Sequence, residues 1–492
     1  MLETATKVRS QVWLAASLIP LCAFVALAWA LLEHPLPWHF SVPWVPSLDI
    51  ALAFRIDALS AQMLALITGI GTLVFIYAAG YLQHEPRRRQ IFLVLPLFML
   101  AMMGAVSADN VILLFTFWEL TSITSFLLVG FNHEDASARN SARQALLITM
   151  AGGLALLGGL ILLAQLAGSW SLSGIVAAAP AMTHEPLLPS AIVLVLIGAF
   201  TKSAQFPFHF WLPNAMSAPT PVSAYLHSAT MVKIVIYLMA RLDPAFNDLL
   251  LWEFILVTVG TLTAIWAAIL ALRERDLKRI LARSTVSALG TLTLLIGLPN
   301  PGSGLAMVSF MVAHALYKAP LFMVAGNIDH ATGTRVIDHL MGLRRVMPGN
   351  ALVAVLAGMS MAGLPLSFGF LAKDIVGIAK ADADIYFLVS YAFIIVNAIA
   401  AGVAGVAAIR VFWGPLELPH GKIHRLPLTM TVPPLAIVLL GIEFELFPRL
   451  VDPLLLPAAK VISPGLDITD LGSSYAFSEL LSAASLTLGT GL

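Results

Sequence analysis

The sequence predicts an all-α polytopic membrane protein with about 13 transmembrane helices, arranged as two inverted five-helix repeats that each contain one broken helix. Three observations predict this fold class. First, 59% of the 492 residues are apolar and only 11% are charged, against about 25% charged in soluble domains. Second, apolar runs of spanning length recur along the chain. Third, the loops between them alternate in their content of Lys and Arg.

The charge balance and the cysteine count exclude several function classes. Lys and Arg together number 27, as do Asp and Glu, so no basic excess is available to bind nucleic acid. The one cysteine, Cys22, lies within an apolar run. An intrachain disulfide, a cysteine-ligated iron–sulfur cluster and a zinc–thiolate site are therefore excluded. No phosphate-binding loop is present, and we expect no cofactor.

Apolar runs of roughly 20 residues mark the expected transmembrane helices. The first follows Lys7 and Arg9, and it is too long for the apolar region of a signal peptide. The run 284–298 is short and would need Arg283 to extend its side chain to the membrane surface. The candidate spans are 11–32, 57–83, 90–107, 109–131, 143–167, 189–217, 221–241, 249–272, 284–298, 304–328, 350–378, 385–413 and 428–447.

Loop charge tests this map independently, because cytoplasmic loops carry an excess of Lys and Arg. Loops 168–188 and 299–303 contain neither residue. We therefore expect a multi-pass protein of the cytoplasmic (inner) membrane, with its amino terminus in the cytoplasm and the stretch after 448 outside. The positive loops contain Lys7 and Arg9, Arg87 to Arg89, Arg139 and Arg143, Arg273 to Arg283, Arg335 to Arg345, and Lys422 and Arg425.

Proline interrupts two of the expected spans. In the sixth, Lys202-Ser-Ala-Gln205 leads to Pro207 and Pro213, and in the eleventh Gly363-Leu-Pro365 precedes Lys373. Proline removes a backbone donor, which is tolerated in lipid only where the freed groups face protein or a wet cavity. A proline kink that serves packing is one explanation. The other is a working site, because each break lies in the fourth helix of a set of five.

These two sets of five helices define the expected domain organisation. Because five is an odd number, the second set enters the membrane in the opposite sense, which is typical of inverted repeats whose working site lies at the broken helices. We expect N-terminal helices over 1–89, repeats over 90–241 and 249–413, and a C-terminal helix followed by the start of a further, incomplete region over 414–492.

Glu119 is the carboxylate placed deepest in an expected span, within Phe115-Thr-Phe-Trp-Glu-Leu-Thr-Ser122. A carboxylate at this depth is costly unless it is hydrated or paired. It is either a neutral acid bonded to a neighbouring helix or a proton-handling group. Desolvation and a nearby ammonium act in opposite directions on the proton affinity of such a group, and proton transfer requires this adjustable balance.

Four lysines within or beside apolar helices are the matching cations: Lys202, Lys233, Lys318 and Lys373. A buried ammonium can release its proton near neutral pH if a counter-charge moves away. Lys202 and Lys373 lie beside the two breaks. Either side chain could instead extend to the membrane surface, an alternative that applies best to Lys373, since Asp374 follows it and the two could form a polar helix end.

Histidines complete the candidate proton path. His314 and Lys318 are four residues apart, so they project from one face of the helix 304–328 and can pass a proton or share a water. His227 shares a helix face with Ser223 and is either a packing residue or a relay. His209 and His330 are weaker candidates.

A metal centre is not expected. His420 and His424 form the one His-x-x-x-His pair, with Glu417 upstream. Pro419 and Gly421 argue against the helix that would align these side chains.

Several segments have residue patterns in common with one known group of proteins. They are Phe117-Trp-Glu-Leu-Thr-Ser122, the stretches 201–213 and 218–232, Asp276-Leu-Lys278, Ser284-Thr-Val-Ser287 and His314-Ala-Leu-Tyr-Lys-Ala319. Over about 57–415 the chain resembles the antiporter-like subunits shared by respiratory complex I and Mrp-type multisubunit cation/proton antiporters. The segments 148–159, 44–49 and 54–57 look most like the large A subunit of the Mrp family, in its N-terminal antiporter-like part.

In that family, the matching residues form a polar axis along the middle of the membrane. The resemblance therefore implies that Glu119, Lys202, Lys318 and Lys373 form such an axis here. Two departures from the family matter. The family usually has one more helix before the first one here, and its large subunit continues beyond the residues matching Leu492, where another apolar segment, 476–492, begins. The chain is thus a fragment or a split subunit, and the sodium route is not specified by it.

The function implied is that of a proton-translocating subunit of a multisubunit Na⁺/H⁺ antiporter, a secondary transporter and not an enzyme. It would handle protons and Na⁺ within the lipid bilayer, together with other small membrane subunits. One alternative is the proton-pumping subunit of a complex I-like NADH:quinone oxidoreductase, although no long amphipathic lateral helix is recognisable after 413. Another is the membrane proton channel of an inorganic-carbon uptake complex.

Overall fold

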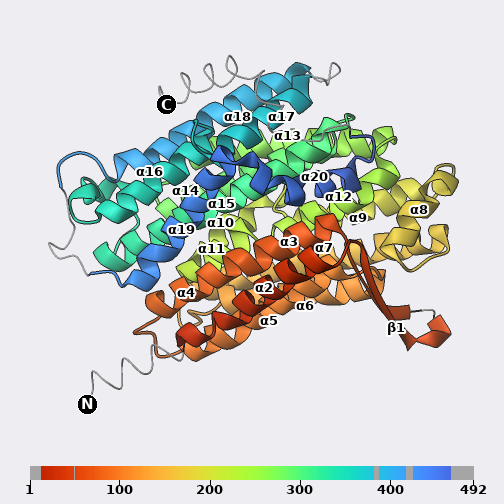
Figure 1. Ribbon diagram of the computed structural model, residues 1–492, viewed down its shortest axis with the longest axis horizontal. Coiled ribbons are helices and arrows are strands. Elements are labelled where there is room, and N and C mark those ends of the chain that lie inside the picture. Colours follow the sequence, from red (N-terminus) through yellow and green to blue (C-terminus); the bar gives the residue numbers. More distant parts are fainter. Residues whose placement is uncertain (1–12, 49, 382–386, 417–424, 467–492) are drawn as a thin grey trace.

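Eleven helices in the described part of the chain are long and apolar enough to cross a membrane. The computed structural model describes residues 13–48, 50–381, 387–416 and 425–466. Figure 1 shows these helices packed side by side, most of them running in a common direction across the view. The expected helical membrane fold is confirmed. The count of about 13 spans and the inverted repeats stay predictions. The loop 417–424 and the apolar segment 476–492 lie outside the described residues.

The first spanning helix, Trp13–Glu33, packs only loosely on the rest of the protein. Most of its spanning stretch is exposed, with 11% of it buried. After it, two antiparallel strands form a hairpin that projects from the bundle (Figure 1). This hairpin departs from the expected all-α fold. The elements of this region are α2 (Leu18–Glu33), β1 (Trp38–Val45), β2 (Ile50–Ile56), α3 (Ala58–Ala65), the π-helical turn Leu66–Ile70 and α4 (Gly71–Tyr81).

The next helices begin at side-chain caps. Asn110 and Asp135 each accept hydrogen bonds from backbone N–H groups of the helix that follows, which satisfies donors left free at a helix start. Glycines bring α7 and α9 together, since a Cβ on Gly159 would lie 2.7 Å from the backbone nitrogen of Val195. These elements are α5 (Arg88–Ser107), α6 (Val111–Val129), α7 (Ala136–Ala167), α8 (Leu172–Met182) and α9 (Leu188–Lys202).

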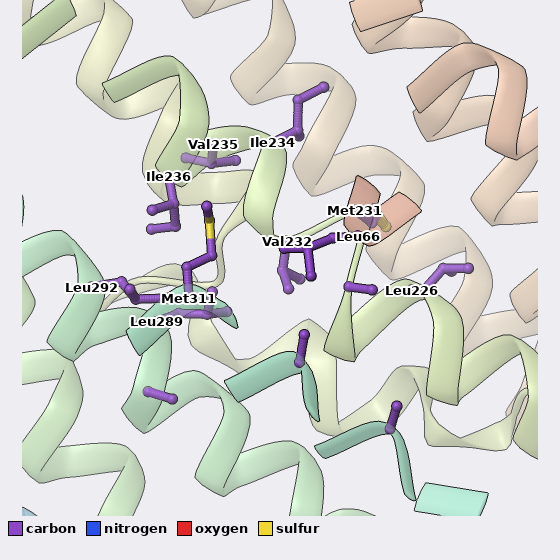
Figure 2. Close-up of a cluster of buried hydrophobic side chains, with 14 of the residues drawn as sticks. Leu66, Leu226, Met231, Val232, Ile234, Val235, Ile236, Leu289, Leu292 and Met311 are labelled. Atoms are coloured by element: carbon purple, nitrogen blue, oxygen red, sulfur yellow. The ribbon is translucent and has the colours of Figure 1, made fainter. Parts of the chain in front are cut away.

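The centre of the bundle is formed by α11, α12 and α15, whose spanning stretches are entirely buried. Figure 2 shows the apolar cluster around the junction of α11 and α12, with Val232 near the middle of the view, Leu226 on one side of it and Leu289 and Met311 on the other. These elements are α10 (Trp211–Asn214), α11 (Thr220–Ser228), α12 (Lys233–Phe246), α13 (Leu250–Ala271), α14 (Leu277–Ile296) and α15 (Gly302–Thr332).

The last helices pack along α15. In particular, α16, α17 and α19 lie against it, and α20 lies against both α15 and α3. These elements are α16 (Pro348–Ala362), α17 (Phe368–Ala381), α18 (Phe387–Gly405), the π-helical turn Val406–Arg410, α19 (Leu428–Leu446) and α20 (Asp452–Ile462).

Both expected interruptions occur in the structure. Helix α9 ends at Lys202 and α16 ends at Ala362. Each break contains a non-glycine residue with positive φ, Ala204 at 53° and Leu366 at 65°, a conformation that L-residues rarely adopt. The two breaks therefore share a backbone feature as well as a position beside a lysine.

One expected span contains a break that was not expected, and one helix limit was wrong. The span 221–241 corresponds to the spanning stretch Thr220–Phe246, which is divided internally because α11 ends at Ser228 and α12 begins at Lys233. The span 284–298 begins at Leu277, where Asp276 caps it. Arg283 therefore lies within the helix, and its Nε donates to Glu274 Oε1 at 2.7 Å instead of extending to the membrane surface from a short span.

Candidate functional site

Lys202 is the last residue of α9 and is fully buried. Its Nζ donates to the carbonyl oxygen of Trp118 at 2.7 Å, to Thr121 Oγ1 at 2.6 Å and to Ser122 Oγ at 3.0 Å. The ammonium also lies 4.5 Å from the centre of the Trp118 ring. All three acceptors belong to α6 and none is charged, so the ammonium can lose its proton without breaking an ion pair.

Glu119 follows Trp118 on α6 but its carboxylate faces α7. Both carboxylate oxygens are buried and neither has a hydrogen-bond partner among the described residues. A Cβ on Gly153 would overlap Oε1 of Glu119, so this glycine makes the space for the carboxylate. The hydrogen bond to a neighbouring helix that a structural acid would need is not formed within the described part of the chain.

Glu119 and Lys202 are close in space but do not touch. The described ion pairs do not include them, yet the two groups interact electrostatically. The Nζ of Lys202, on α9, thus lies at the turn of α6 that carries Glu119, without an ion pair between the two groups among the described residues. A change in the protonation of one alters the potential at the other.

Lys233 is the first residue of α12, at the break that the sequence analysis did not anticipate. It is fully buried, and its Nζ donates to the carbonyl oxygen of Met311 on α15 at 2.7 Å. Met311 belongs to the apolar cluster of Figure 2. His314 lies on α15, fully buried, within electrostatic range of Lys233 and of Lys318. His314 is therefore close enough to both lysines to be influenced by their charge.

Lys318 is fully buried on the same helix as His314 and donates to Ser284 Oγ on α14 at 2.5 Å. Ser284 in turn lines a small cavity of about 40 Å³, together with Ser287, Tyr317 and Lys373. This volume is large enough for at least one water. The cavity therefore connects the acceptor of Lys318 with Lys373.

Lys373, on α17, bonds across the second break. Its Nζ donates to the carbonyl oxygen of Ala362, the last residue of α16, at 3.0 Å. A Cβ on Gly363, whose φ is 75°, would overlap the Lys373 side chain. The ammonium thus lies inside the break instead of extending to the membrane surface. The neighbouring Asp374 is 3% exposed, and its carboxylate oxygens have no hydrogen-bond partner in the described structure.

His227 is fully buried on α11, and neither of its ring nitrogens has a hydrogen-bond partner among the residues described. It lies within electrostatic range of Lys278. Lys278 was absent from the predicted site, yet it is 1% exposed and donates to the carbonyl oxygen of Ala218 at 2.7 Å. Asp276 was the signal in the sequence that could have found Lys278. A helix that begins at this capping residue, before the short run 284–298, has Lys278 in its first turn.

The remaining candidates lie away from this row. His209 is bonded to Trp266, with 3.1 Å between Nε2 and Nε1, and the ring of His330 lies 5.8 Å from that of Tyr81. Pro207 lies in the first break, between α9 and the 3₁₀ turn Phe208–Phe210, Pro213 lies within α10, and Pro365 lies between α16 and α17. Within the described residues no group of three His, Cys, Asp or Glu residues is arranged to hold a metal ion. The pair His420 and His424 falls in the segment that the structure does not describe.

A second polar cluster, also missed from the sequence, ties the start of α3 to α12. The guanidinium of Arg241 donates twice to the Asp57 carboxylate and, at 2.9 Å each, to Ser60 Oγ and the Tyr237 hydroxyl. Burial raises the pKa of Asp57, but the hydrogen bond and charge of Arg241 outweigh it and hold the pKa below its usual value. Asp57 therefore stays ionised at neutral pH and anchors the two helices together.

Two family models match the chain. One, described as NADH:quinone oxidoreductase/Mrp antiporter, TM, matches residues 108–399. The other, described as NADH-Ubiquinone oxidoreductase (complex I), chain 5 N-terminus, matches residues 42–92. The first match contains Glu119 and all four predicted lysines.

Two curated relatives match most of the chain. It is 44% identical over 401 residues to the A/B subunit of a probable K⁺/H⁺ antiporter from Rhizobium meliloti, covering 80% of this chain and 40% of the relative. It is 41% identical over 453 residues to the A subunit of a Na⁺/H⁺ antiporter from Alkalihalophilus pseudofirmus, covering 86% and 56%. The chain thus spans about half the length of the curated relatives it matches.

Two solved structures share the fold. The Mrp complex from Dietzia sp. matches with a TM-score of 0.90 and 33% identity, covering 98% of this chain and 53% of that chain. The membrane-bound sulfane sulfur reductase, an archaeal respiratory membrane complex, matches with a TM-score of 0.80 and 21% identity, covering 98% and 96%. The second likeness concerns the fold alone.

Proposed function

The chain belongs to the family of membrane subunits described as NADH:quinone oxidoreductase/Mrp antiporter, and on that premise we propose that it is the proton-translocating part of a multisubunit Na⁺/H⁺ antiporter. One observation carries the proposal. Lys202, Lys233, Lys318 and Lys373 each direct Nζ at an uncharged oxygen inside the bundle. Ammonium groups that merely stabilised the fold would be expected to pair with carboxylates.

The proposed proton path follows this row of groups. It begins with Glu119 and Lys202, continues through Lys233, His314 and Lys318, and ends at Lys373 beside the second break. His227, in the last turn of α11, and Lys278, which donates to the carbonyl oxygen of Ala218 before that helix, form a side branch. Waters in the small cavity beside Ser284 would carry the proton between Lys318 and Lys373.

The proton gradient itself supplies the energy in this proposal. Moving one charge across 100 mV is worth about 2.3 kcal/mol. An exchange of more protons than sodium ions can therefore extrude sodium against its own gradient. The names of the curated relatives as cation/proton antiporter subunits support this source of energy over quinone reduction. We place the chain in the cytoplasmic membrane, with its amino terminus in the cytoplasm and further membrane subunits beside it.

A vesicle experiment tests the proposal. A proton gradient would be imposed on everted membrane vesicles that contain the whole complex, without a respiratory substrate, and sodium would then be added. Antiport predicts that sodium dissipates the gradient, whereas a redox-driven pump gives no response under these conditions. Lys318→Ala should abolish the response. Lys460→Ala, which removes an exposed lysine on α20, serves as the matched control and should respond as wild type.

A further inference from the structure

A cavity whose lining contains none of the lysines of the proposed path lies between the loosely packed first helix and the body of the bundle. Its volume is about 1010 Å³, and its walls come from α2, α8, α12 and α20. The labels of α8, α12 and α20 lie toward one end of the molecule in Figure 1. The volume is at the upper end of what a small-molecule site occupies.

The walls of this groove are apolar and exposed. Leu31 and Leu32 of α2 face Leu450 and the α20 residues Leu454 and Val461 across it. Leu32 is 86% exposed and Leu450 is 55% exposed. Since α2 is a spanning helix with few contacts to the bundle, hydrocarbon chains have lateral access to the groove from the bilayer.

The polar end of the groove lies at the helix ends, where the membrane surface would be. Asp57 caps α3, Asp109 directly precedes the cap of α6, and Arg55 lies at the end of β2. The backbone N–H of Asp109 donates to the carbonyl oxygen of Ala53 at 2.9 Å, which holds Asp109 close to Arg55. Charged side chains thus line the same groove as apolar residues from the last two turns of α2 and from α20.

Arg55 is the member of this group with unused capacity. Asp57 is bonded by Arg241, and Asp109 accepts from the N–H of Ser173 at 2.9 Å and from its hydroxyl at 2.6 Å. Arg55 Nε lies 3.8 Å from Asp57 Oδ2, beyond hydrogen-bond distance. This N–H is buried and has no hydrogen-bond partner among the described residues. A buried donor without a partner costs free energy that a ligand oxygen would recover.

We propose that this groove binds a phospholipid, with its phosphate on the guanidinium of Arg55 and its acyl chains along α2 and α20. The planar fork of arginine matches phosphate oxygens in a bidentate geometry. Asp57 and Asp109 already accept hydrogen bonds from other donors, so the 3.8 Å ion pair with Asp57 is the interaction of Arg55 that the phosphate would have to share. The lipid would fill the space between α2 and the bundle and so fix the position of the first helix. This inference does not depend on the transport activity.

The test uses membranes that contain the whole complex and a phosphatidylethanolamine with a photoactivatable acyl chain. After illumination, labelled peptides are identified by mass spectrometry. Label should appear on residues 28–32 and 450–461. Arg55→Gln should reduce this label about tenfold or more, since hydrogen bonds to charged groups are the strong ones. Ala28→Trp, which fills the groove from its apolar wall, should also remove the label. Arg279→Gln, at an exposed arginine outside the groove, should leave it unchanged.

Competition on the wild-type protein keeps the proposal testable even if Arg55→Gln fails to assemble. Unlabelled phosphatidylethanolamine or phosphatidylglycerol should displace the probe, whereas diacylglycerol with the same acyl chains and inorganic phosphate should not. Equal competition by diacylglycerol would show a merely apolar surface, and competition by phosphate a simple anion site. Either result overturns the proposal. Wild-type labelling that misses both segments also overturns it. So does cross-linking of a Leu31→Cys variant to another polypeptide, because the groove would then be covered by protein instead of lipid.

Discussion

The ammonium of Lys202 donates a 2.7 Å hydrogen bond to the carbonyl oxygen of Trp118, the residue directly before Glu119. Lys202 is thereby bound to the helix that carries the acid without being bonded to the acid itself. The Glu119 carboxylate faces Gly153 on the other side. Lys202 and Glu119 therefore lie near each other without an ion pair, and the first three predictions follow from this arrangement.

Glu119→Ala should abolish sodium-dependent proton exchange while the complex still assembles, because it removes a titrating group and not a hydrogen bond that holds helices together. Glu119→Asp should retain part of the activity. Exchange is measured in everted vesicles from the recovery of an imposed pH gradient on addition of sodium. If Glu119→Ala vesicles respond as wild type, the pair with Lys202 is only structural.

Gly153→Ala should impair exchange through the same acid. The added methyl group displaces the end of a flexible side chain, so the fold tolerates it but the carboxylate moves. A misplaced proton donor or acceptor costs on the order of tenfold to a hundredfold in rate. The matched control is Gly405→Ala, where a Cβ meets nothing within 4 Å. Equal exchange rates in the two variants would contradict the role assigned to Gly153.

Lys202 and Lys373 should respond alike to substitution, because each lies at a helix break with its ammonium on backbone or hydroxyl oxygen. Alanine at either position should stop proton passage. Arginine should largely fail too, since a guanidinium does not release its proton. Rates in vesicles and complex abundance are measured together. Full activity of Lys373→Arg would identify Lys373 as a fixed positive charge.

Arg241→Ala should destabilise the protein by about 3–5 kcal/mol, because it leaves the buried Asp57 carboxylate without its partner.

The pKa of Asp57 is lowered in the folded state. Its contribution to stability is therefore fully present above the unfolded pKa of about 3.9 and is lost as the pH falls through the lower folded value. Thermal unfolding in detergent should show a large difference between wild type and Asp57→Asn at pH 7 that shrinks below about pH 4. A constant difference across this range would contradict the assignment.

The chain by itself should not exchange sodium. The predicted path offers Glu119 and several cations, whereas a dehydrated sodium ion needs several oxygen ligands, preferably charged ones, and protonated lysines at the breaks would repel it. The measurement is exchange in liposomes containing this chain alone, with an imposed pH gradient. Sodium-dependent exchange at the rate of the whole complex would refute the idea, and activity restored by partner subunits would support it.

The sequence alone determined the membrane fold and indicated both proline breaks, and it singled out Glu119, Lys202, Lys233, Lys318 and Lys373 as ionisable groups within apolar spans. These features can be recognised in the sequence because a charge or an unpaired backbone group costs free energy in lipid. Such residues are therefore rare within apolar spans.

What each of these groups faces was decided only by the tertiary structure. Lys202 and Trp118 are 84 positions apart, and Arg241 and Asp57 are 184 apart, so neither contact follows from local periodicity. The break before Lys233 contains no proline, and the groove at Arg55 is formed by helices from both ends of the chain. Sequence patterns show which side chains must face protein instead of lipid, because the free-energy cost of exposing a side chain to lipid depends on its residue type. The partner of each side chain depends on how distant helices pack, and that is a property of the folded bundle.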